Sequence, residues 1–381
     1  SLTGAPLLAK WLFEWIDKNT EIEIEIIHVR EHYRKGKSKR ELRLLLLSFY
    51  LELNRVGNSK YLGIKLIKKV LGLVPVLDQL VLELSRRSVK RYNLVYLNTL
   101  AVKPILPIIE GLGIPIITHA HEMSFAVKSS QEHCDVSRQI ALSSLVIAPS
   151  LPVAKFVHTI NNLRRVCIIP EYLPCERIRA LRDVDESYLH KQLGIPADTI
   201  IIGMCGTPNS RKGFDLLPQI ISRLSDKIDN KNVSIVWIGA NIESYESKQI
   251  VHDLELLGLK DQVVMVSPRP DAYLFMKVFH IYAHPSREDP YPLSALEAAS
   301  LGITVVCFKQ AGGMEEFVND ICGISVDYLD IDAFANALNR LIDNTQLRAT
   351  LGNNARCKVL KESTLDRAAS SIVDIIHKEL A

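Results

Sequence analysis

Short apolar runs alternate with helical apolar periodicity along the second half of the chain. The runs are rich in Val and Ile and predict strands at 199–205, 233–238, 263–266, 279–283 and 304–308. The segments between them have helical spacing and predict helices at 214–224, 249–257, 271–278, 294–301 and 331–342. Strands without polar alternation are typically buried on both faces. The order therefore predicts an α/β fold with a doubly wound parallel sheet.

The first half shows the same alternation less regularly. Strands are predicted at 22–29, 94–97, 114–118, 145–148 and 166–169, and helices at 7–18, 41–53 and 139–143. Polar or small residues follow several strands, as at Asn98, His119, Ser150 and Glu171. Ligands of open α/β sheets bind beyond the carboxyl ends of strands, so these positions are candidates for a site. Residues 1–6 resemble a loop that normally follows a strand, and we expect a first strand to be missing ahead of them.

Charge divides the chain into two parts. Residues 1–183 hold 27 Lys+Arg and 17 Asp+Glu, a net charge of +10, and the remainder has a net charge of −7. Such a split indicates two domains with different partners. We place the boundary in the charged stretch 179–187, which gives domains at 1–183 and 184–363. Residues 364–381 form a separate amphipathic helix, which we expect to pack back on the first domain.

Composition excludes several classes of protein. Hydrophobic residues make up 48% and charged residues 23% of the chain, as in ordinary globular proteins. No apolar stretch approaches the roughly 20 residues that span a bilayer, and no signal peptide is visible. The seven cysteines are scattered and odd in number, which favours free thiols in a reducing compartment over disulfides or a zinc site. We expect a cytoplasmic protein.

Residues 284–297 are the most informative stretch. Asp289 lies in a turn rich in proline, just ahead of a predicted helix, and Glu297 lies eight positions later within that helix. A helix N-terminus attracts anions such as phosphate, and carboxylates accept hydrogen bonds from hydroxyls. A ligand with phosphates and many hydroxyls, such as a nucleotide sugar, fits this combination.

Two glycine-containing loops also follow strands. Gly206 and Gly213 flank Arg211 and Lys212 before a helix, in neither a Walker A nor a dinucleotide-binding pattern. Taken alone, this segment fits a phosphate site and a solvated basic helix start about equally well. The other loop contains Gly312-Gly313 and is followed by Glu315 and Glu316. Alone, it is more typical of a turn with an acidic helix start.

Together and in order, these motifs resemble the nucleotide-sugar domain of glycosyltransferase family 4, over residues 199–345. Lys212-Gly213, the pair Asp289 and Glu297, and Gly312-Gly313 followed by Glu315-Glu316 match the family's three motifs. The family usually has Glu where Asp289 stands, and Glu288 is an alternative for that role. Many members have an Arg where Thr207 stands, and Arg211 is expected to supply that charge. The resemblance implies a GT-B architecture of two Rossmann-like domains that face each other across a cleft.

The resemblance also implies roles for individual residues. Lys212 and Arg211 would neutralise the departing diphosphate, Asp289 would hold sugar hydroxyls, and Glu297 would hold the ribose. The other donor-binding positions are Gly206, Tyr291, Pro292, Leu293, Gly312, Gly313 and Glu316. His121, Lys212 and Asp289 are the predicted catalytic residues.

The first half resembles the family's acceptor domain more faintly. His121 matches a strand-end histidine of the family and would lie near the reacting carbon, and His119, Glu122 and Gly4 are placed on the acceptor side. Alone, a strand-end histidine more often makes a structural hydrogen bond. A metal site on the two histidines and Glu122 is set aside, because no further ligand is identifiable and the family works without a required metal. No cofactor is expected.

The predicted function is retaining transfer of a sugar from a nucleotide diphosphate sugar to an acceptor hydroxyl, in polysaccharide or glycolipid biosynthesis. The acceptor would be a saccharide or a lipid-linked group. Basic residues at 30–43, 65–69 and 86–91 are either a solvated surface or a contact with anionic lipid at the inner face of the membrane. Nucleic acid is not expected as a partner. The alternatives are a sugar-nucleotide epimerase of the same fold and a non-catalytic transferase-like binding protein.

Overall fold

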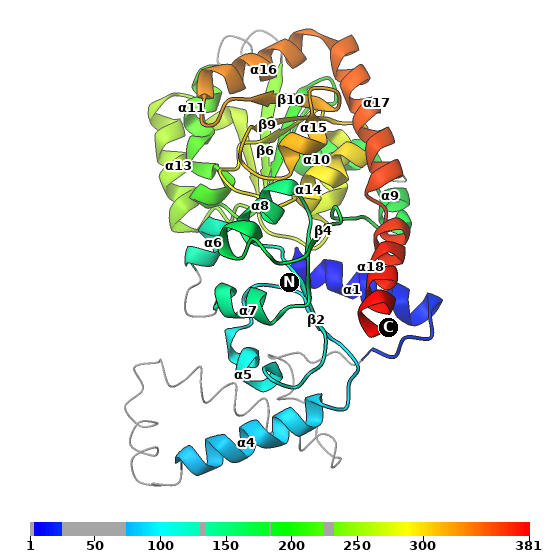
Figure 1. The fold of residues 1–381 in the computed structure, drawn as a ribbon. Helices are drawn as coiled ribbons and strands as arrows, with labels where there is room; N and C mark the ends of the chain where they lie inside the picture. The colour runs from blue at the N-terminus through cyan, green and yellow to red at the C-terminus, as the bar shows by residue number, and fades with distance from the viewer. Residues whose placement is uncertain (1–3, 25–73, 130–133, 183, 225–231) are drawn as a thin grey trace.

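The computed structural model describes residues 4–24, 74–129, 134–182, 184–224 and 232–381 (Figure 1). The predicted helix 41–53 lies outside these residues, as do the basic residues at 30–43 and 65–69. The predicted strand 22–29 is described only at 22–24, where the backbone is not in a strand.

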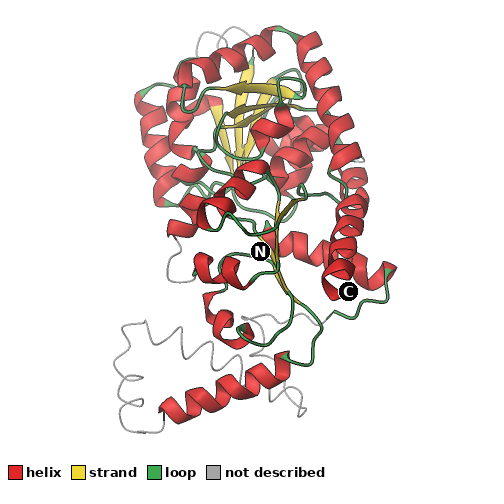
Figure 2. Ribbon diagram, in the orientation of Figure 1, coloured by secondary structure: helices red, strands yellow, loops and turns green. Residues whose placement is uncertain are grey.

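Two parallel sheets form the molecule, with helices around each of them (Figure 2). The first has the order β1-β2-β3-β4, from β1 (Val95–Leu97), β2 (Ile116–His119), β3 (Leu145–Ala148) and β4 (Val166–Ile168). The second has the order β10-β9-β8-β5-β6-β7. Its strands are β5 (Ile200–Cys205), β6 (Val233–Ile238), β7 (Val263–Val266), β8 (Ile281–His284), β9 (Thr304–Phe308) and β10 (Gly323–Val326). Two parallel sheets confirm the predicted α/β class.

The helices occupy the segments between strands. In the first half they are α1 (Ala5–Asn19), α4 (Val74–Val89), α5 (Leu106–Ile109), α6 (Ser124–Ser129), α7 (Val136–Leu142), α8 (Leu151–Ile160) and α9 (Cys175–Arg182). In the second half they are α10 (Glu186–Leu193), α11 (Leu217–Ser222), α13 (Tyr245–Leu256), α14 (Leu293–Ser300), α15 (Met314–Val318), α16 (Ile331–Asp343), α17 (Thr345–Glu362) and α18 (Leu365–Leu380). Short 3-10 turns add η1 (Lys103–Ile105), η2 (Ser210–Lys212), η3 (Phe214–Leu216), η4 (Lys260–Gln262) and η5 (Ala272–Val278).

Each face of the second sheet is buried, which is why its strands carry few polar residues. Trp237 and Phe308 belong to the apolar cluster on one side, and Tyr282 and Phe317 to the cluster on the other. The strand order changes direction between β5 and β8, which are neighbours in the sheet. Loops that leave the carboxyl ends of these two strands therefore meet, and in doubly wound sheets this is where ligands bind.

The last two helices connect the two sheets. α17 packs along the second sheet, on α14 and β9, and the chain then crosses so that α18 lies on α1 beside the first sheet (Figure 1). Leu12 and Ile16 of α1 and Ile372 of α18 are fully buried in one cluster with Ile147 of β3. Trp15 Nε1 donates to Asp366 Oδ1 at 2.7 Å in the same region.

None of the described helices combines the length and the apolar character that a membrane-spanning helix needs.

Candidate active site

The loops after β5 and β8 bring the predicted donor-binding residues together. Lys212 Nζ forms an ion pair with Asp289 Oδ2, and Arg211 Nη1 lies 4.0 Å from the same oxygen. Arg211 also donates to the backbone oxygen of Glu288 at 2.7 Å. His284, the last residue of β8, places Nε2 at 3.8 Å from Asp289 Oδ2. A buried carboxylate thus faces a cluster of basic side chains.

Electrostatics set the charge states in this cluster. Burial opposes ionisation of Asp289, but Lys212, His284 and Arg211 together lower the pKa of its carboxyl. Burial lowers the pKa of His284 to about 4, and the two cations reinforce this effect against the opposing Asp289. Asp289 is therefore ionised at neutral pH and His284 is neutral, which leaves Lys212 and Arg211 as the basic groups that carry charge.

Glycines shape both loops through close backbone contacts. Gly213 has φ +74°, and a Cβ there would lie 2.0 Å from the backbone oxygen of Pro285. Gly312 has φ +131°, and a Cβ there would lie 1.8 Å from the backbone oxygen of Asp289. Asp289 N donates to Ala311 O at 2.7 Å, so the two segments form a short parallel bridge. Gly213 and Gly312 therefore let their loops pack closely against the backbone at Pro285 and Asp289, which holds that segment in place.

Glu297 is buried on α14 and has a partner that the sequence did not reveal. Arg177 of α9 donates from Nε to Glu297 Oε1 at 2.5 Å. The Arg177 guanidinium also lies over the ring of Tyr273, 3.7 Å from its centroid. Burial raises the pKa of Glu297, and the charge and hydrogen bond of Arg177 oppose that rise.

Two other carboxylates of the second sheet reach helices beside the first sheet. Glu288 accepts hydrogen bonds from the backbone N–H groups of Phe125 and Ala126, at 2.9 and 3.1 Å, and from Ser124 Oγ at 3.3 Å. Glu316, a predicted donor-binding residue, accepts from Leu151 N at 3.2 Å.

A backbone oxygen joins the sheets in the same region: Ser150 Oγ donates to Pro290 O at 3.0 Å. The structure therefore uses these acidic and backbone groups to hold the two sheets against each other.

The acceptor-side residues lie beyond β2. His119 and His121 are neighbours, with ring centroids 4.1 Å apart. His121 Nδ1 lies 2.7 Å from Glu171 Oε1 and its Nε2 lies 3.2 Å from Asn98 Oδ1. Glu122 accepts from Leu100 N at 2.9 Å, so its carboxylate holds the backbone of the neighbouring loop.

Gly4, also placed on the acceptor side, lies at the start of α1. It has φ +61°, and its backbone oxygen accepts from Leu7 N at 2.9 Å and Leu8 N at 3.1 Å.

In the structure Glu171, and not Glu122, stands with the two histidines as a potential metal ligand, and the sequence did not single it out for that role. One ligand atom each of His119, His121 and Glu171 lies within 4.8 Å of the others. The signal in the sequence was the position of Glu171 just after β4, at the same carboxyl edge as the histidines after β2. Its pairing with a residue 50 positions earlier has no local sequence signature.

Three of the basic residues at 86–91 make local contacts, and one of them is Arg91, whose Nη2 donates to Tyr92 Oη at 2.7 Å. Arg86 donates to Glu110 O at 2.7 Å, and Arg87 pairs with Glu83 one helical turn away.

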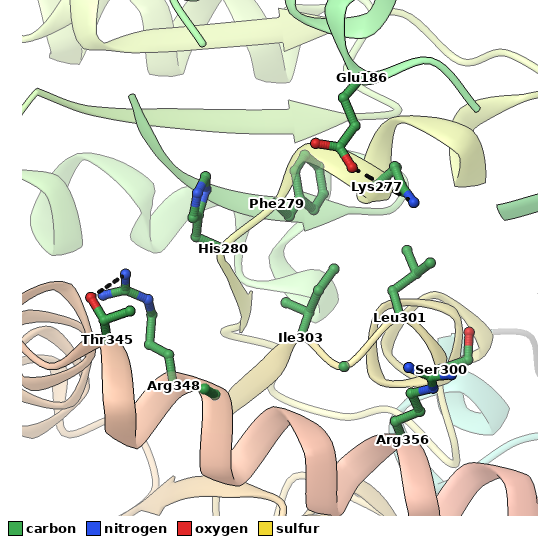
Figure 3. A pocket seen from close by; sticks show the side chains of 12 residues that line it. Glu186, Lys277, Phe279, His280, Ser300, Leu301, Ile303, Thr345, Arg348 and Arg356 are labelled. Atoms are coloured by element: carbon green, nitrogen blue, oxygen red, sulfur yellow. Dashed lines mark hydrogen bonds and ion pairs between the residues drawn. The ribbon is translucent and has the colours of Figure 1, made fainter. Parts of the chain in front are cut away.

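A cavity of about 250 Å³ lies between α6 and the loop after β5. Phe125, Ala126 and Ser129 line one side, and Asn209, Ser210 and Arg211 line the other. A second cavity, of about 550 Å³, lies away from the loops that follow β5 and β8 (Figure 3). Phe279, His280 and Ile303 line it, directly before β8 and β9, which places it at the amino edge of the sheet. The first cavity, beside Arg211, is the one that belongs to the candidate site.

Comparison with known proteins shows which proteins this chain resembles. Residues 185–358 match the family model described as "Glycosyl transferases group 1". The D-inositol 3-phosphate glycosyltransferase of Corynebacterium glutamicum is 23% identical over 295 residues, which cover 72% of this chain and 69% of that protein. The Staphylococcus aureus capsular polysaccharide biosynthesis glycosyltransferase CapM is 27% identical over 46% of this chain and 44% of that protein.

Solved structures show the same fold. Anabaena Alr3699/HepE in complex with UDP superposes with a TM-score of 0.67 at 23% identity, covering 80% of this chain and 84% of that one. WaaG, a glycosyltransferase involved in lipopolysaccharide biosynthesis, superposes with a TM-score of 0.56 at 17% identity, covering 68% and 75%. The architecture is GT-B, as the resemblance implied. The sequence likeness to the group 1 glycosyltransferases covers residues 185–358 of this chain.

Proposed function

We propose that the protein is a retaining glycosyltransferase that moves a sugar from a nucleotide diphosphate sugar to an acceptor hydroxyl. One observation carries this proposal. Lys212, after β5, and Asp289, after β8, meet at the carboxyl ends of two adjacent parallel strands. Arg211 lies beside them and lines the cavity between the two sheets. This edge of the sheet thus offers cations for a diphosphate and a carboxylate for hydroxyls.

Lys212 and Arg211 act on the leaving group in this proposal. The bond between the sugar and the diphosphate breaks in the transition state, and negative charge builds up on the phosphate oxygens. Cations that are already in place stabilise that charge without reorganisation of solvent. When the diphosphate binds, Lys212 exchanges part of its ion pair with Asp289 for phosphate oxygens. The two side chains thereby take the role that a divalent metal has in other transferases, and no metal is required for transfer.

The carboxylates act as hydroxyl acceptors. Asp289 is ionised and buried, and release of Lys212 leaves its oxygens free to accept from the sugar. Glu297 offers the ribose the oxygen that Arg177 does not use. Both carboxylates have cationic partners, so we do not assign them the acid and base roles of a glycosidase pair. We propose attack on the same face as the leaving group, with a phosphate oxygen taking the acceptor proton.

The relatives suggest the kinds of acceptor to test. The name of one relative specifies D-inositol 3-phosphate, and the name of another specifies capsular polysaccharide biosynthesis. We propose a saccharide or a lipid-linked saccharide in polysaccharide or glycolipid biosynthesis. We also propose that the protein is cytoplasmic and that its first half contacts an anionic membrane face, and the net charge of +10 on residues 1–183 supports the membrane contact.

A donor assay tests the proposal. UDP-glucose is the first donor to test, because Anabaena HepE was solved with it, and other UDP, GDP and dTDP sugars follow. The assay measures nucleotide release with a panel of acceptors, and NMR gives the anomeric configuration of the product. We expect nucleotide release with at least one donor and retention of configuration. An inverted product would refute the retaining mechanism, and an epimerised nucleotide sugar without transfer would support the epimerase alternative. Ligand binding without nucleotide release would support the non-catalytic alternative.

A further inference from the structure

A second basic region lies in the cavity of about 550 Å³ at the amino edge of the second sheet (Figure 3). Three cationic side chains line this cavity, those of Lys277, Arg348 and Arg356. The carboxylate of Glu186 is the one acidic group in the same lining. Cavities of roughly 300–1,000 Å³ are typical of sites for small molecules. The excess of cations therefore favours a small anion as the occupant.

Arg348 is held in a fixed orientation by neutral groups. Its Nη1 donates to the backbone oxygens of Leu341 and Ile342, the latter at 3.0 Å, and its Nη2 donates to Thr345 Oγ1 at 3.0 Å. None of the described carboxylates forms an ion pair with it. Burial lowers the pKa of Arg348, but a guanidinium stays charged in proteins and has five N–H groups. Arg348 thus keeps its charge and has further N–H groups for a ligand.

Arg356 lies about two turns further along α17. It is partly buried, and it has no hydrogen-bond or ion-pair partner among the described residues. A charged group that loses water without gaining a partner is unfavourable in a folded protein. In Figure 3 the three cationic side chains lie around Ile303 and Leu301. An anion between them would supply the partner that Arg356 lacks.

The acidic residue of the lining is loosely held. Lys277 Nζ lies 3.6 Å from Glu186 Oε1, which is longer than an ordinary hydrogen bond. The Glu186 side chain is 59% exposed and the Lys277 side chain 21% exposed. Ion pairs of this kind contribute little to stability, so an incoming anion can replace Glu186 beside Lys277.

Neutral donors complete the lining. His280 Nδ1 accepts from Ile201 N at 3.2 Å, so Nε2 carries the proton of the neutral ring. Burial and the charge of Arg348 lower the pKa of His280, which keeps the ring neutral at neutral pH. Thr345 is the first residue of α17, and the N-terminal end of a helix carries partial positive charge. Phosphate oxygens accept hydrogen bonds from all of these groups.

We propose that this cavity binds a small organic phosphate, held by Arg348, Arg356 and Lys277. Guanidinium groups bind phosphate oxygens with paired N–H groups, which makes arginine well suited to this anion. Leu301 and Ile303 provide an apolar wall for the organic part of the ligand. The cavity and the candidate active site lie at opposite edges of one sheet, so the ligand does not compete with the donor. The proposal therefore does not depend on the proposed transferase function.

Calorimetry on the full chain tests the proposal with two organic phosphates, glucose 6-phosphate and AMP. Glucose and adenosine are the matched controls without phosphate. We expect at least one of the two phosphates to bind with a stoichiometry near one and a dissociation constant of roughly 1 mM or tighter, and neither control to bind. Absence of binding by both phosphates would overturn the proposal, and so would equal binding of a phosphate and its control.

Variants locate the bound phosphate. Arg356→Gln removes a side chain that makes no hydrogen bond to the described residues, so it should fold and should weaken binding at least about tenfold. Lys361→Gln, on the same helix outside the cavity, is the matched control and should bind like wild type. If Arg356→Gln does not fold, Lys277→Gln takes its place with the same expectation.

Lys212→Ala separates this cavity from the candidate active site. Lys212 lies at the opposite edge of the sheet, so the variant should bind the organic phosphate like wild type. Loss of binding in Lys212→Ala, with unchanged affinity in Arg356→Gln, would place the phosphate at the candidate active site and overturn the proposal.

Discussion

Replacement of Arg177 by Met tests how much the buried ion pair between Arg177 and Glu297 stabilises the protein. The Arg177 side chain is 21% exposed and the Glu297 side chain 7% exposed, and the two are joined by a hydrogen bond of 2.5 Å. Met keeps much of the volume of Arg but leaves Glu297 as a buried carboxylate without its cation. Removal of one partner from a buried pair costs roughly 3–5 kcal/mol. Because Arg177 keeps some contact with water, we expect the free energy of unfolding to fall by about 3 kcal/mol. This loss includes that of the contact between Arg177 and Tyr273.

The pH dependence of this loss follows from the pKa of Glu297. Burial raises that pKa in the folded protein, and Arg177 holds the rise down. Without Arg177 the folded-state pKa rises further. A group with a raised folded-state pKa favours folding below its unfolded pKa, and that contribution is lost as pH rises through the folded pKa. The stability difference between Arg177→Met and wild type should therefore be larger at pH 8 than at pH 5.

Urea unfolding at the two pH values measures the effect, with the double variant Arg177→Met/Glu297→Met as control. Replacement of a whole buried ion pair by apolar residues is often close to neutral, so the double variant should recover most of the lost stability. Equal losses in the single and double variants would refute the reasoning, because the loss would then come from packing. A single variant as stable as wild type at pH 8 would also refute it.

Two further predictions concern the loops and the contacts between the sheets. Gly312→Ala should destabilise the protein by about 3 kcal/mol or more and weaken nucleotide binding, because its Cβ would strike the backbone of Asp289. Gly258→Ala, with φ +70° and open space around it, should show only the strain of its positive φ, roughly 1 kcal/mol, and equal unfolding free energies for the two variants would contradict this. Glu288→Ala should speed amide exchange at Phe125 and Ala126 by at least about tenfold, since it removes hydrogen bonds to a charged acceptor. Hydrogen exchange read by mass spectrometry checks this, and unchanged exchange in the peptide containing both amides would show that Glu288 does not hold α6.

Local sequence patterns were sufficient to predict most strands of the second sheet. β5, β6, β7 and β9 begin and end within about one residue of the predicted strands, because each is a run of mostly apolar residues rich in Val or Ile. β10 was not predicted, since Gly323 to Val326 is short and contains Ser325. The short helix predicted at 271–278 is a 3-10 helix over Ala272–Val278.

The partners within the site could not be predicted in the same way. Arg177 and Glu297 are 120 positions apart, and His121 and Glu171 are 50 apart. Spacing along the chain carries no information about such pairs. His121 and Glu171 meet because they follow two strands of the same sheet, β2 and β4, and Arg177 meets Glu297 where the chain passes from the first sheet to the second. The motifs at Lys212, Asp289 and Gly312 were recognisable because each lies within a few residues of a strand end.

Binding of UDP to wild type and to Lys212→Ala, measured by calorimetry, tests the central claim most directly. Lys309→Ala is the matched control, because Lys309 forms an exposed ion pair with Asp327. We expect wild type and Lys309→Ala to bind UDP alike. Lys212→Ala should bind UDP at least about tenfold more weakly, which is a loss of roughly 1.4 kcal/mol or more of binding free energy. That variant lacks a cation and also leaves Asp289 to repel the diphosphate. Equal affinity of Lys212→Ala and wild type would contradict the account.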